Sequence, residues 1–362
     1  MSSDASAASY PPFTGVAGVP ATSSEPLSVP SVRPRRTPLT CVPLSQTPLP
    51  VLDQAVPPWP GEQLSVDGGM LHVRRTPGPD ADPVTAADPV TAVYVHGLGG
   101  SSTNWTDLAG QLSWHAGGVA VDLPGFGRSR PPEGYSFTLR AQAAAVVALI
   151  RALGDRPVHL LGNSMGGATS ILVAARHPEL VRTMTLISPA VPDLRPNPRR
   201  LSDPRLAVAC LPVLGERARR GLAEATPRMR AEQTMRLCFA DLSQVVPHRL
   251  DEAESETEER LALPWAAEAL QRATLDLLRS WLVPARRSLW RRLPEITAPT
   301  LVVWGVEDKL ITVRKAEKTA RLLPSGRLLV LPYTGHVAQI ERPVAVARAV
   351  LGMWQAVQNG RW

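Results

Sequence analysis

Short apolar runs alternate along the chain with longer segments in which apolar residues recur every three or four positions. Five of the short runs predict buried strands, because each is bounded by polar, Gly or Pro positions. They lie at residues 93–95, 158–161, 184–188, 300–305 and 327–331. Residues 141–153 and 168–176 have the length and apolar spacing of helices that face a core. This order of elements favours an α/β domain.

Two further regions complete the pattern. Asp67-Gly68 separates residues 63–66 from residues 70–74, and an Asp-Gly pair between two such runs predicts a hairpin. Between residues 190 and 300 no clear buried strand is present, and prolines divide the segment into helical stretches. These stretches lie at residues 214–224, 228–237 and 266–281. The pattern therefore indicates a helical insertion between two strands.

The N-terminal segment, residues 1–57, differs from the rest of the chain in composition. It is rich in Pro, Ser and Thr and has little apolar periodicity. Such a segment cannot bury enough apolar surface to offset the entropy lost on ordering. We expect it to be largely disordered.

Composition places the remainder of the chain among globular proteins. A chain of 362 residues with 44% hydrophobic content can form one large α/β domain and an insertion. We find no apolar run long enough to span a bilayer and no secretory signal pattern at the N-terminus. The three cysteines match no metal-ligand spacing and favour a reducing compartment. We therefore expect a cytoplasmic protein without a metal or an organic cofactor.

The formal net charge is +7, and all but three of the 39 basic residues are arginine. These residues are interspersed with acids, and the sequence contains no nucleic-acid-binding motif. We expect no nucleic-acid partner. Weak attraction to an anionic membrane surface is compatible with the charge.

The strongest chemical signal is Gly162-Asn163-Ser164-Met165-Gly166-Gly167, between the strand at 158–161 and the helix at 168–176. A strand, a sharp turn and a helix form the context of a G-x-S-x-G nucleophile elbow. The glycines matter because side chains beside the nucleophile would collide in this strained turn. The motif predicts that Ser164 is a nucleophile.

A serine hydroxyl needs a base, and the base needs an orienting carboxylate. Asp308 follows the strand at 300–305, and His336 follows the strand at 327–331. This chain order, Ser then acid then His, is typical of the elbow architecture. We expect Asp308 and His336 to be the acid and the base. His248 lies in a helical, strongly charged stretch and is expected at the surface.

His96-Gly97-Leu98-Gly99-Gly100 follows the strand at 93–95. Acyl chemistry requires two backbone N–H donors for the developing oxyanion. The N–H groups of Leu98 and Met165 are in the chain positions that supply them. A plain flexible loop is the alternative, whereas the glycine pattern does not fit a phosphate-binding P-loop.

From residue 59 onward these motifs together resemble the α/β-hydrolase superfamily, including the segment Asp122-Leu123-Pro124-Gly125-Phe126-Gly127-Arg128-Ser129. The resemblance implies a mostly parallel eight-stranded sheet flanked by helices, with an inserted helical cap. It divides the chain into a first core part at residues 58–190, a cap at 191–293 and a second core part at 294–362. The cap is expected to shape the substrate pocket.

The resemblance implies a serine hydrolase that forms an acyl-enzyme on Ser164. The expected substrate is a carboxylic ester of a small or medium, mostly apolar acyl compound. Three alternatives stay open: carbon–carbon bond hydrolysis of an aromatic ring-fission product, cofactor-free haloperoxidase or perhydrolase chemistry, and a non-catalytic small-molecule-binding protein on the same fold.

The carbon–carbon alternative has its own support in the sequence. The elbow, Asn104-Trp105 and the segment after Gly335-His336 are similar to ring-fission-product hydrolases, from which the chain departs at Val337 and Thr334. The residues expected to contact substrate are Asn104, Trp105, Asn163 and Val337.

Overall fold

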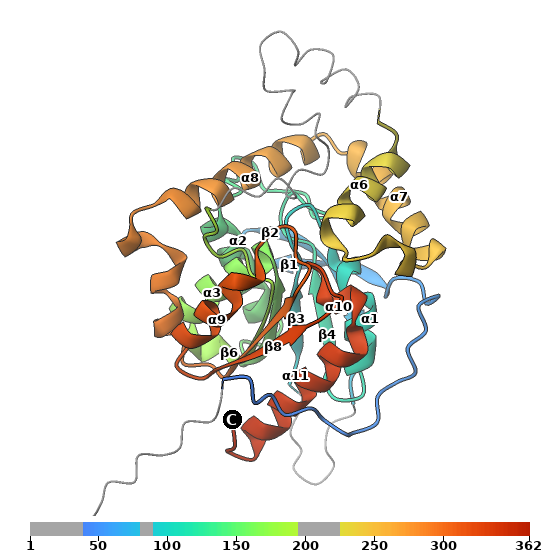
Figure 1. The fold of residues 1–362 in the computed structure, drawn as a ribbon. Coiled ribbons are helices and arrows are strands. Elements are labelled where there is room, and N and C mark those ends of the chain that lie inside the picture. The colour runs from blue at the N-terminus through green and yellow to red at the C-terminus, as the bar shows by residue number, and fades with distance from the viewer. Residues whose placement is uncertain (1–38, 80–89, 195–224) are drawn as a thin grey trace, which may run out of the picture. The chain divides into compact units, whose positions relative to one another are not determined.

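The computed structural model describes residues 39–79, 90–194 and 225–362, and its centre is an eight-stranded sheet (Figure 1). The strand order is β1-β2-β4-β3-β5-β6-β7-β8. The β1–β2 and β2–β4 pairs are antiparallel, and all other pairs are parallel. The strands are β1 (Gly61–Val66), β2 (Gly69–Thr76), β3 (Ala92–Val95), β4 (Gly118–Val121), β5 (Val158–Asn163), β6 (Val181–Ile187), β7 (Thr300–Gly305) and β8 (Gly326–Leu331).

Helices cover both faces of this sheet, so its central strands are buried on both sides. In β3, Val93 and Val95 point into one core cluster, while Ala92 and Tyr94 point into the other. This is the two-residue alternation of a strand. The first cluster includes residues of α2 (Leu139–Ala152), α3 (Met165–Arg176) and α9 (Ala316–Leu322), and the second includes residues of α1 (Thr106–Leu112) and α11 (Pro343–Gln358).

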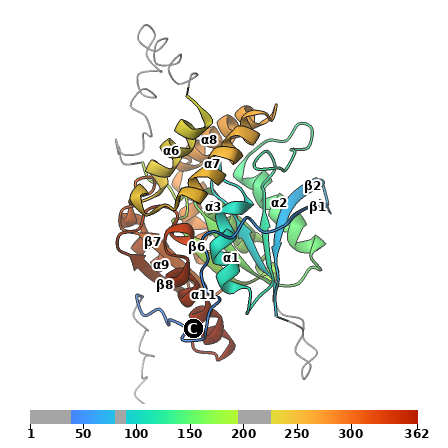
Figure 2. The same ribbon diagram turned by 90° about the vertical axis from the view of Figure 1, so that its right-hand side faces the viewer.

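The described part of the insertion is helical. α6 (Pro227–Cys238), α7 (Pro247–Leu261) and α8 (Ala266–Leu282) follow β6 in the chain and precede β7. They lie together at one end of the sheet, as both ribbon views show (Figures 1 and 2). The short helix α10 (Ala338–Glu341) follows β8 and leads into α11.

The structure confirms the five predicted strands, the hairpin at Asp67-Gly68 and the helices that flank the elbow strand. Helices also span the whole of the predicted stretches at 228–237 and 266–281. The predicted helix at 214–224 lies outside the described residues. No helix in the described ranges combines the length and the hydropathy needed to cross a membrane.

The expectation of disorder over residues 1–57 is wrong for the part that the structure describes, residues 39–57. The N–H of Ser45 donates to the carbonyl of Arg348, whose guanidinium donates back to the carbonyl of Ser45, at 2.9 Å each. A Cβ at Gly352 of α11 would lie 1.9 Å from the carbonyl oxygen of Pro43. Tertiary contacts with α11 therefore hold a segment whose composition alone predicted disorder. Residues 1–38 lie outside the described residues.

Candidate active site

Ser164 lies at the turn between β5 and α3. Its backbone has φ 54° and ψ −117°, which a non-glycine residue adopts only under constraint. The N–H of Ser164 donates to the carbonyl of Ile187 at 3.0 Å, and its carbonyl accepts from Ala168 and Ala190. A Cβ at Gly166 would lie 2.1 Å from the carbonyl oxygen of Val95. The glycine therefore allows the close backbone approach that holds the strained turn.

Asp308 and His336 meet beyond the ends of the neighbouring strands β7 and β8. Asp308 Oδ2 lies 2.9 Å from His336 Nδ1, and both side chains are almost fully buried. The N–H groups of Leu310 and Ile311 donate to Asp308 Oδ1 at 2.9 and 3.0 Å. His336 Nε2 is buried and has no hydrogen-bond partner among the described residues. With Nδ1 donating to the carboxylate, Nε2 carries the lone pair that could accept a proton.

Asn163 joins the elbow to the loop between β8 and α10, residues 332–337, which carries His336 and is called the histidine loop below. Its side-chain amide donates to the carbonyl of Ile187 at 3.1 Å and to the carbonyl of His336 at 3.0 Å. Asn163 is buried. Both N–H donors of its amide are therefore used within the protein, and a substrate contact by its carbonyl oxygen stays a prediction.

The turn after β3 approaches Ser164. A Cβ at Gly97 would lie 3.1 Å from Ser164 Cβ. His96 is buried, its Nδ1 lies 2.7 Å from the carbonyl oxygen of Gly97, and its Nε2 accepts from the N–H of Leu123 at 3.0 Å. Burial lowers the pKa of His96, which favours the neutral ring that this arrangement requires. His96 therefore supports the turn from the core side.

The backbone N–H groups of Leu98 and Met165 donate no hydrogen bond to any described residue. Met165 is the first residue of α3, where N–H groups have no partner within the helix and carry partial positive charge. Both donors are thus available for an anion.

The other three predicted substrate contacts differ from one another. Asn104 Oδ1 accepts from the N–H of Ser101 at 3.3 Å, so Asn104 caps the short helical turn that follows the glycines. Trp105 is fully buried beside Tyr94, with ring centroids 5.3 Å apart. Trp105 is thus a core residue, which corrects the expectation that it contacts substrate, whereas Asn104 is part-exposed and stays a predicted substrate contact. Val337 is buried directly after His336.

Residues that the sequence did not single out tie the histidine loop to the insertion. The N–H of His336 donates to the carbonyl of Cys238, the last residue of α6, at 2.6 Å. The Glu341 carboxylate accepts from the N–H groups of Ala240 and Gly335 at 2.9 and 2.7 Å. Lys309 Nζ donates to the carbonyl of Phe239 at 2.7 Å. Only the folded chain brings these segments together, so no local pattern could have indicated them.

Two side chains near the His336–Asp308 pair have roles other than that of a nucleophile or of the acid beside His336. Burial raises the pKa of the Cys238 thiol to about 12, which keeps it protonated and unreactive as a nucleophile. Glu307 Oε2 accepts from the N–H of Thr334 at 2.8 Å, so this carboxylate supports the histidine loop through its backbone. In the described ranges no group of His, Cys, Asp and Glu side chains could hold a metal ion.

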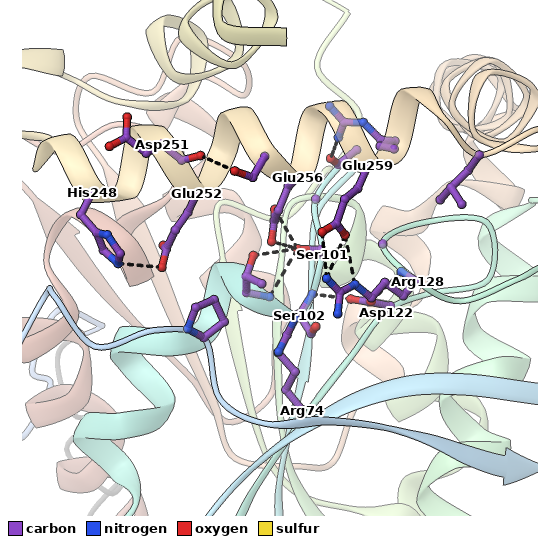
Figure 3. Close-up of a pocket in the computed structure, with 18 residues that line it drawn as sticks. Arg74, Ser101, Ser102, Asp122, Arg128, His248, Asp251, Glu252, Glu256 and Glu259 are labelled. Atoms are coloured by element: carbon purple, nitrogen blue, oxygen red, sulfur yellow. Dashed lines mark hydrogen bonds and ion pairs between the residues drawn. The ribbon is translucent and has the colours of Figure 1, made fainter.

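Helix α7 borders a cavity of about 370 Å³ beside the turn after β3, and most residues that line it are polar or charged (Figure 3). Its lining includes Ser101, Asp122, Glu256 and Arg260, but neither Ser164 nor His336. Figure 3 shows Glu256 and Glu259 pointing from α7 toward the turn after β3. Glu259 is exposed and pairs with Arg128, whereas Glu256 is only part-exposed. His248 lies half exposed on the same helix and pairs with Glu252.

The strained elbow, the buried His–Asp pair and the strand order occur together in one known family. The family model for the alpha/beta hydrolase fold matches residues 92–343. The chain belongs to this family. Within the family, a monoacylglycerol lipase of Xenopus laevis is 27% identical over 278 residues, which are 74% of this chain and 76% of that protein.

Two other relatives of this α/β hydrolase differ in chemistry. A 2-hydroxy-6-oxo-6-phenylhexa-2,4-dienoate hydrolase of Comamonas testosteroni is 29% identical over 267 residues, 71% of this chain and 85% of that protein. A solved structure of a bacterial membrane phospholipase A superposes with a TM-score of 0.62 at 28% identity and covers 83% of this chain and 87% of that one. The relatives establish a hydrolase, while their substrates differ.

Proposed function

We propose that this α/β hydrolase is a serine-nucleophile carboxylic ester hydrolase that acts on a small or medium apolar substrate. The single observation that carries the proposal is the buried His336–Asp308 pair, whose free Nε2 belongs to the loop that Asn163 ties to the Ser164 elbow. A base held in one tautomer beside a strained serine turn suits acyl transfer.

The reaction proceeds in two steps. Ser164 Oγ attacks the ester carbonyl carbon, His336 Nε2 takes the hydroxyl proton, and Asp308 stabilises the imidazolium. The N–H groups of Leu98 and Met165 bind the oxyanion of the tetrahedral intermediate. Its collapse breaks the bond to the leaving alkoxide, which takes the proton from His336 and departs as an alcohol. Water then attacks the acyl-enzyme with His336 again as base, which releases the acid and regenerates Ser164.

The relatives support an ester as the first choice of substrate. A lipase and a phospholipase, both acting on carboxylic esters by name, are among the proteins that this chain resembles at 27 and 28% identity. The carbon–carbon hydrolase relative is equally close at 29% identity. The function therefore has to be tested with both kinds of substrate side by side.

The test combines an active-site label with a substrate panel. A fluorophosphonate probe should label the wild-type protein at Ser164, located by peptide mass spectrometry, and Ser164→Ala should abolish labelling and turnover. Ser170→Ala is the matched control, since its hydroxyl donates to the carbonyl of Gly166 inside α3. p-Nitrophenyl esters of graded chain length should be cleaved faster than a ring-fission diketone.

Other outcomes separate the alternatives. Faster cleavage of the diketone would assign carbon–carbon hydrolysis to the same triad. Perhydrolysis that exceeds ester hydrolysis would favour peracid chemistry. Undiminished labelling of the Ser164→Ala variant would show that the nucleophile is wrong, and a wild type that neither labels nor turns over would favour the non-catalytic alternative.

A further inference from the structure

Helix α7 contacts the turn that carries Leu98 at two points. Arg260 Nη1 donates to the carbonyl oxygen of Gly99 at 2.6 Å. The hydroxyl of Ser101 lies 3.2 Å from each carboxylate oxygen of Glu256, an approach that Figure 3 shows from the side of the helix. Glu256 and Arg260 are four residues apart and therefore lie on the same face of α7.

These two contacts hold the turn from the side opposite to its core support. On the core side, the Gly97 carbonyl is held by the His96 ring and by the N–H of Gly100. On the α7 side, Arg260 and Glu256 hold the next residues of the same turn. The peptide N–H of Leu98 lies in the chain between these two sets of anchors. This N–H belongs to the same planar peptide group as the Gly97 carbonyl, so the core-side bonds orient it, and the contacts from α7 hold the residues that follow it in the turn.

The space around these contacts shows that they are bridges rather than general packing. A cavity of about 370 Å³ separates much of α7 from the turn, and both Glu256 and Arg260 line it. Gly99 has φ +71°, a conformation that depends on glycine and that local side-chain packing does not enforce. A flexible residue beside a cavity needs specific contacts to keep one orientation.

The charges at this contact are costly to bury. Burial lowers the pKa of Arg260 and raises the pKa of Glu256, so each charged form is disfavoured there. Removal of a charged side chain from water costs free energy, so burial of these two groups is weak evidence for a stabilising role. The benefit of this pair is better sought in the geometry that it imposes on the turn.

We infer that Arg260 and Glu256 are positioning residues of α7 that help to aim the Leu98 N–H into the oxyanion hole through their contacts with Gly99 and Ser101. This inference rests on the serine hydrolase function proposed above. Arg260 does not touch the reacting atoms in this arrangement. It acts on them through the Gly99 carbonyl.

Arg249 provides a matched control on the same helix. It is largely buried, and it pairs with Asp107 of α1 and with Glu252. Arg249 thus docks α7 onto the core through α1, outside the segment that runs from His96 to Ser101. Arg249→Met removes a docking ion pair without removing a contact to the turn.

The experiment compares Arg260→Met, Arg260→Lys, Glu256→Gln and Arg249→Met with the wild type. The readouts are kcat and KM for a p-nitrophenyl ester, the inhibition constant of a trifluoromethyl ketone and the melting temperature. The ketone forms a hemiketal oxyanion on Ser164, so its affinity reports the oxyanion hole directly.

Arg260→Met should lower kcat by about 10- to 100-fold, less than the loss of a whole oxyanion donor, and leave KM within about twofold. The affinity of the ketone should fall by the same factor as kcat. Arg260→Lys should recover part of both losses, and Glu256→Gln, which keeps an acceptor for Ser101, should lose less. Arg249→Met should lower the melting temperature and keep kcat within about twofold.

Equal effects of Arg260→Met and Arg249→Met on kcat and on ketone affinity would overturn the inference. So would a variant of Arg260 that melts earlier but binds the ketone as the wild type does. If Arg260→Met does not fold, Arg260→Lys and Glu256→Gln are compared with Arg249→Met in the same way. A wild-type protein that forms no ketone adduct at Ser164 would instead refute the proposed function.

Discussion

At the scale of single residues, the Ser164 turn depends on backbone contacts with its neighbours. A non-glycine residue at φ 54° and ψ −117° stores about 1–3 kcal/mol of backbone strain. Three backbone hydrogen bonds to Ile187, Ala168 and Ala190 hold it there. Because the turn is fixed by the backbone, substitution of the serine side chain should leave the fold intact and remove only the nucleophile.

Substitution of the proposed base and of the proposed acid should lower kcat by different factors. His336→Ala removes the proton acceptor, so the rate should fall to what the oxyanion hole and binding alone provide. Asp308→Asn keeps the shape but favours the wrong imidazole tautomer, and it should lower kcat by about 10⁴. Glu307→Gln keeps an oxygen that can accept from the N–H of Thr334 and should cost little. Steady-state kinetics with one ester measure all three.

The double variant Asp308→Asn with His336→Ala tests whether the groups act as one unit. It should be barely slower than the worse single variant, because removal of the base already removes the function of the acid. Multiplicative losses would contradict this assignment. A larger loss at Glu307 than at Asp308 would show that Glu307 is the acid.

Glu256 predicts a pH dependence of stability. Burial raises its pKa in the folded protein, with Asp122 adding to the rise and Arg74 opposing it. A raised carboxyl pKa means that the folded state binds the proton more tightly than the unfolded state. The favourable contribution of protonated Glu256 is therefore present at low pH and is lost as the pH rises above the ordinary Glu value of about 4.3.

Glu256→Gln removes this titration, since the amide stays neutral. The melting temperature of the variant relative to the wild type should therefore shift upward between about pH 4 and pH 8. Scanning calorimetry at constant ionic strength measures this difference. Glu317→Gln, an exposed residue of α9 paired with Arg321, is the control. A difference that is constant with pH would exclude the raised pKa.

At the scale of elements, the histidine loop and the end of α6 behave as one unit. Glu341 joins them because its carboxylate accepts from Ala240 of the insertion and from Gly335 of the loop. Glu341→Gln keeps one acceptor oxygen and should loosen one of the two contacts. We expect kcat to fall about 10-fold with little change in KM, because a small misplacement of His336 raises the barrier.

The measurement is kcat and KM for the same ester, together with the rate of fluorophosphonate labelling. Labelling should slow by a similar factor, since His336 activates Ser164 in that reaction as well. Glu317→Gln again serves as a control for the loss of a carboxylate elsewhere. An unchanged labelling rate in Glu341→Gln would mean that the loop holds His336 without help from α6.

The sequence predicts those elements that depend on local pattern. The elbow at Ser164 and the glycines after His96 are contiguous motifs, and the five strands are short apolar runs. Trp105 was misjudged because its place beside Asn104 in a motif says nothing about burial, which the packing on Tyr94 determines. Glu341 and Arg260 escaped notice because their partners are distant in sequence.

At the scale of the whole molecule, long-range contacts determine which segments are ordered, and composition alone does not show this. Residues 39–57 have the composition of a disordered segment, yet Ser45 and Arg348 of α11 exchange hydrogen bonds, and Gln111 of α1 donates to the carbonyl of Pro50. Ordering of an extended segment costs little side-chain entropy when its residues are proline or serine. The helices of the insertion are likewise positioned by long-range contacts, because Cys238, Ala240 and Arg260 form hydrogen bonds with residues of the core.

We expect different parts of the insertion to determine substrate preference and the reactivity of Ser164. Replacement of residues 191–293 by the corresponding segment of a relative should change the preferred chain length of the ester, because a covering insertion shapes the substrate pocket. Reactivity of Ser164 should depend instead on whether the replacement keeps the contacts to the core loops. Those contacts are the backbone at Cys238 and Ala240 and the side chains of Glu256 and Arg260.

Two chimeras distinguish these effects. One keeps the segment 236–241 and the Glu256 and Arg260 positions of this chain, and the other replaces them as well. Both should rank p-nitrophenyl esters differently from the parent. The first should label with fluorophosphonate at nearly the parental rate. The second should label at least about 10-fold more slowly, because the turn that carries Leu98 and the histidine loop lose their contacts with the insertion. Parental ranking in both chimeras would place specificity in the core, and equal labelling rates would show that the core loops need no anchor from the insertion.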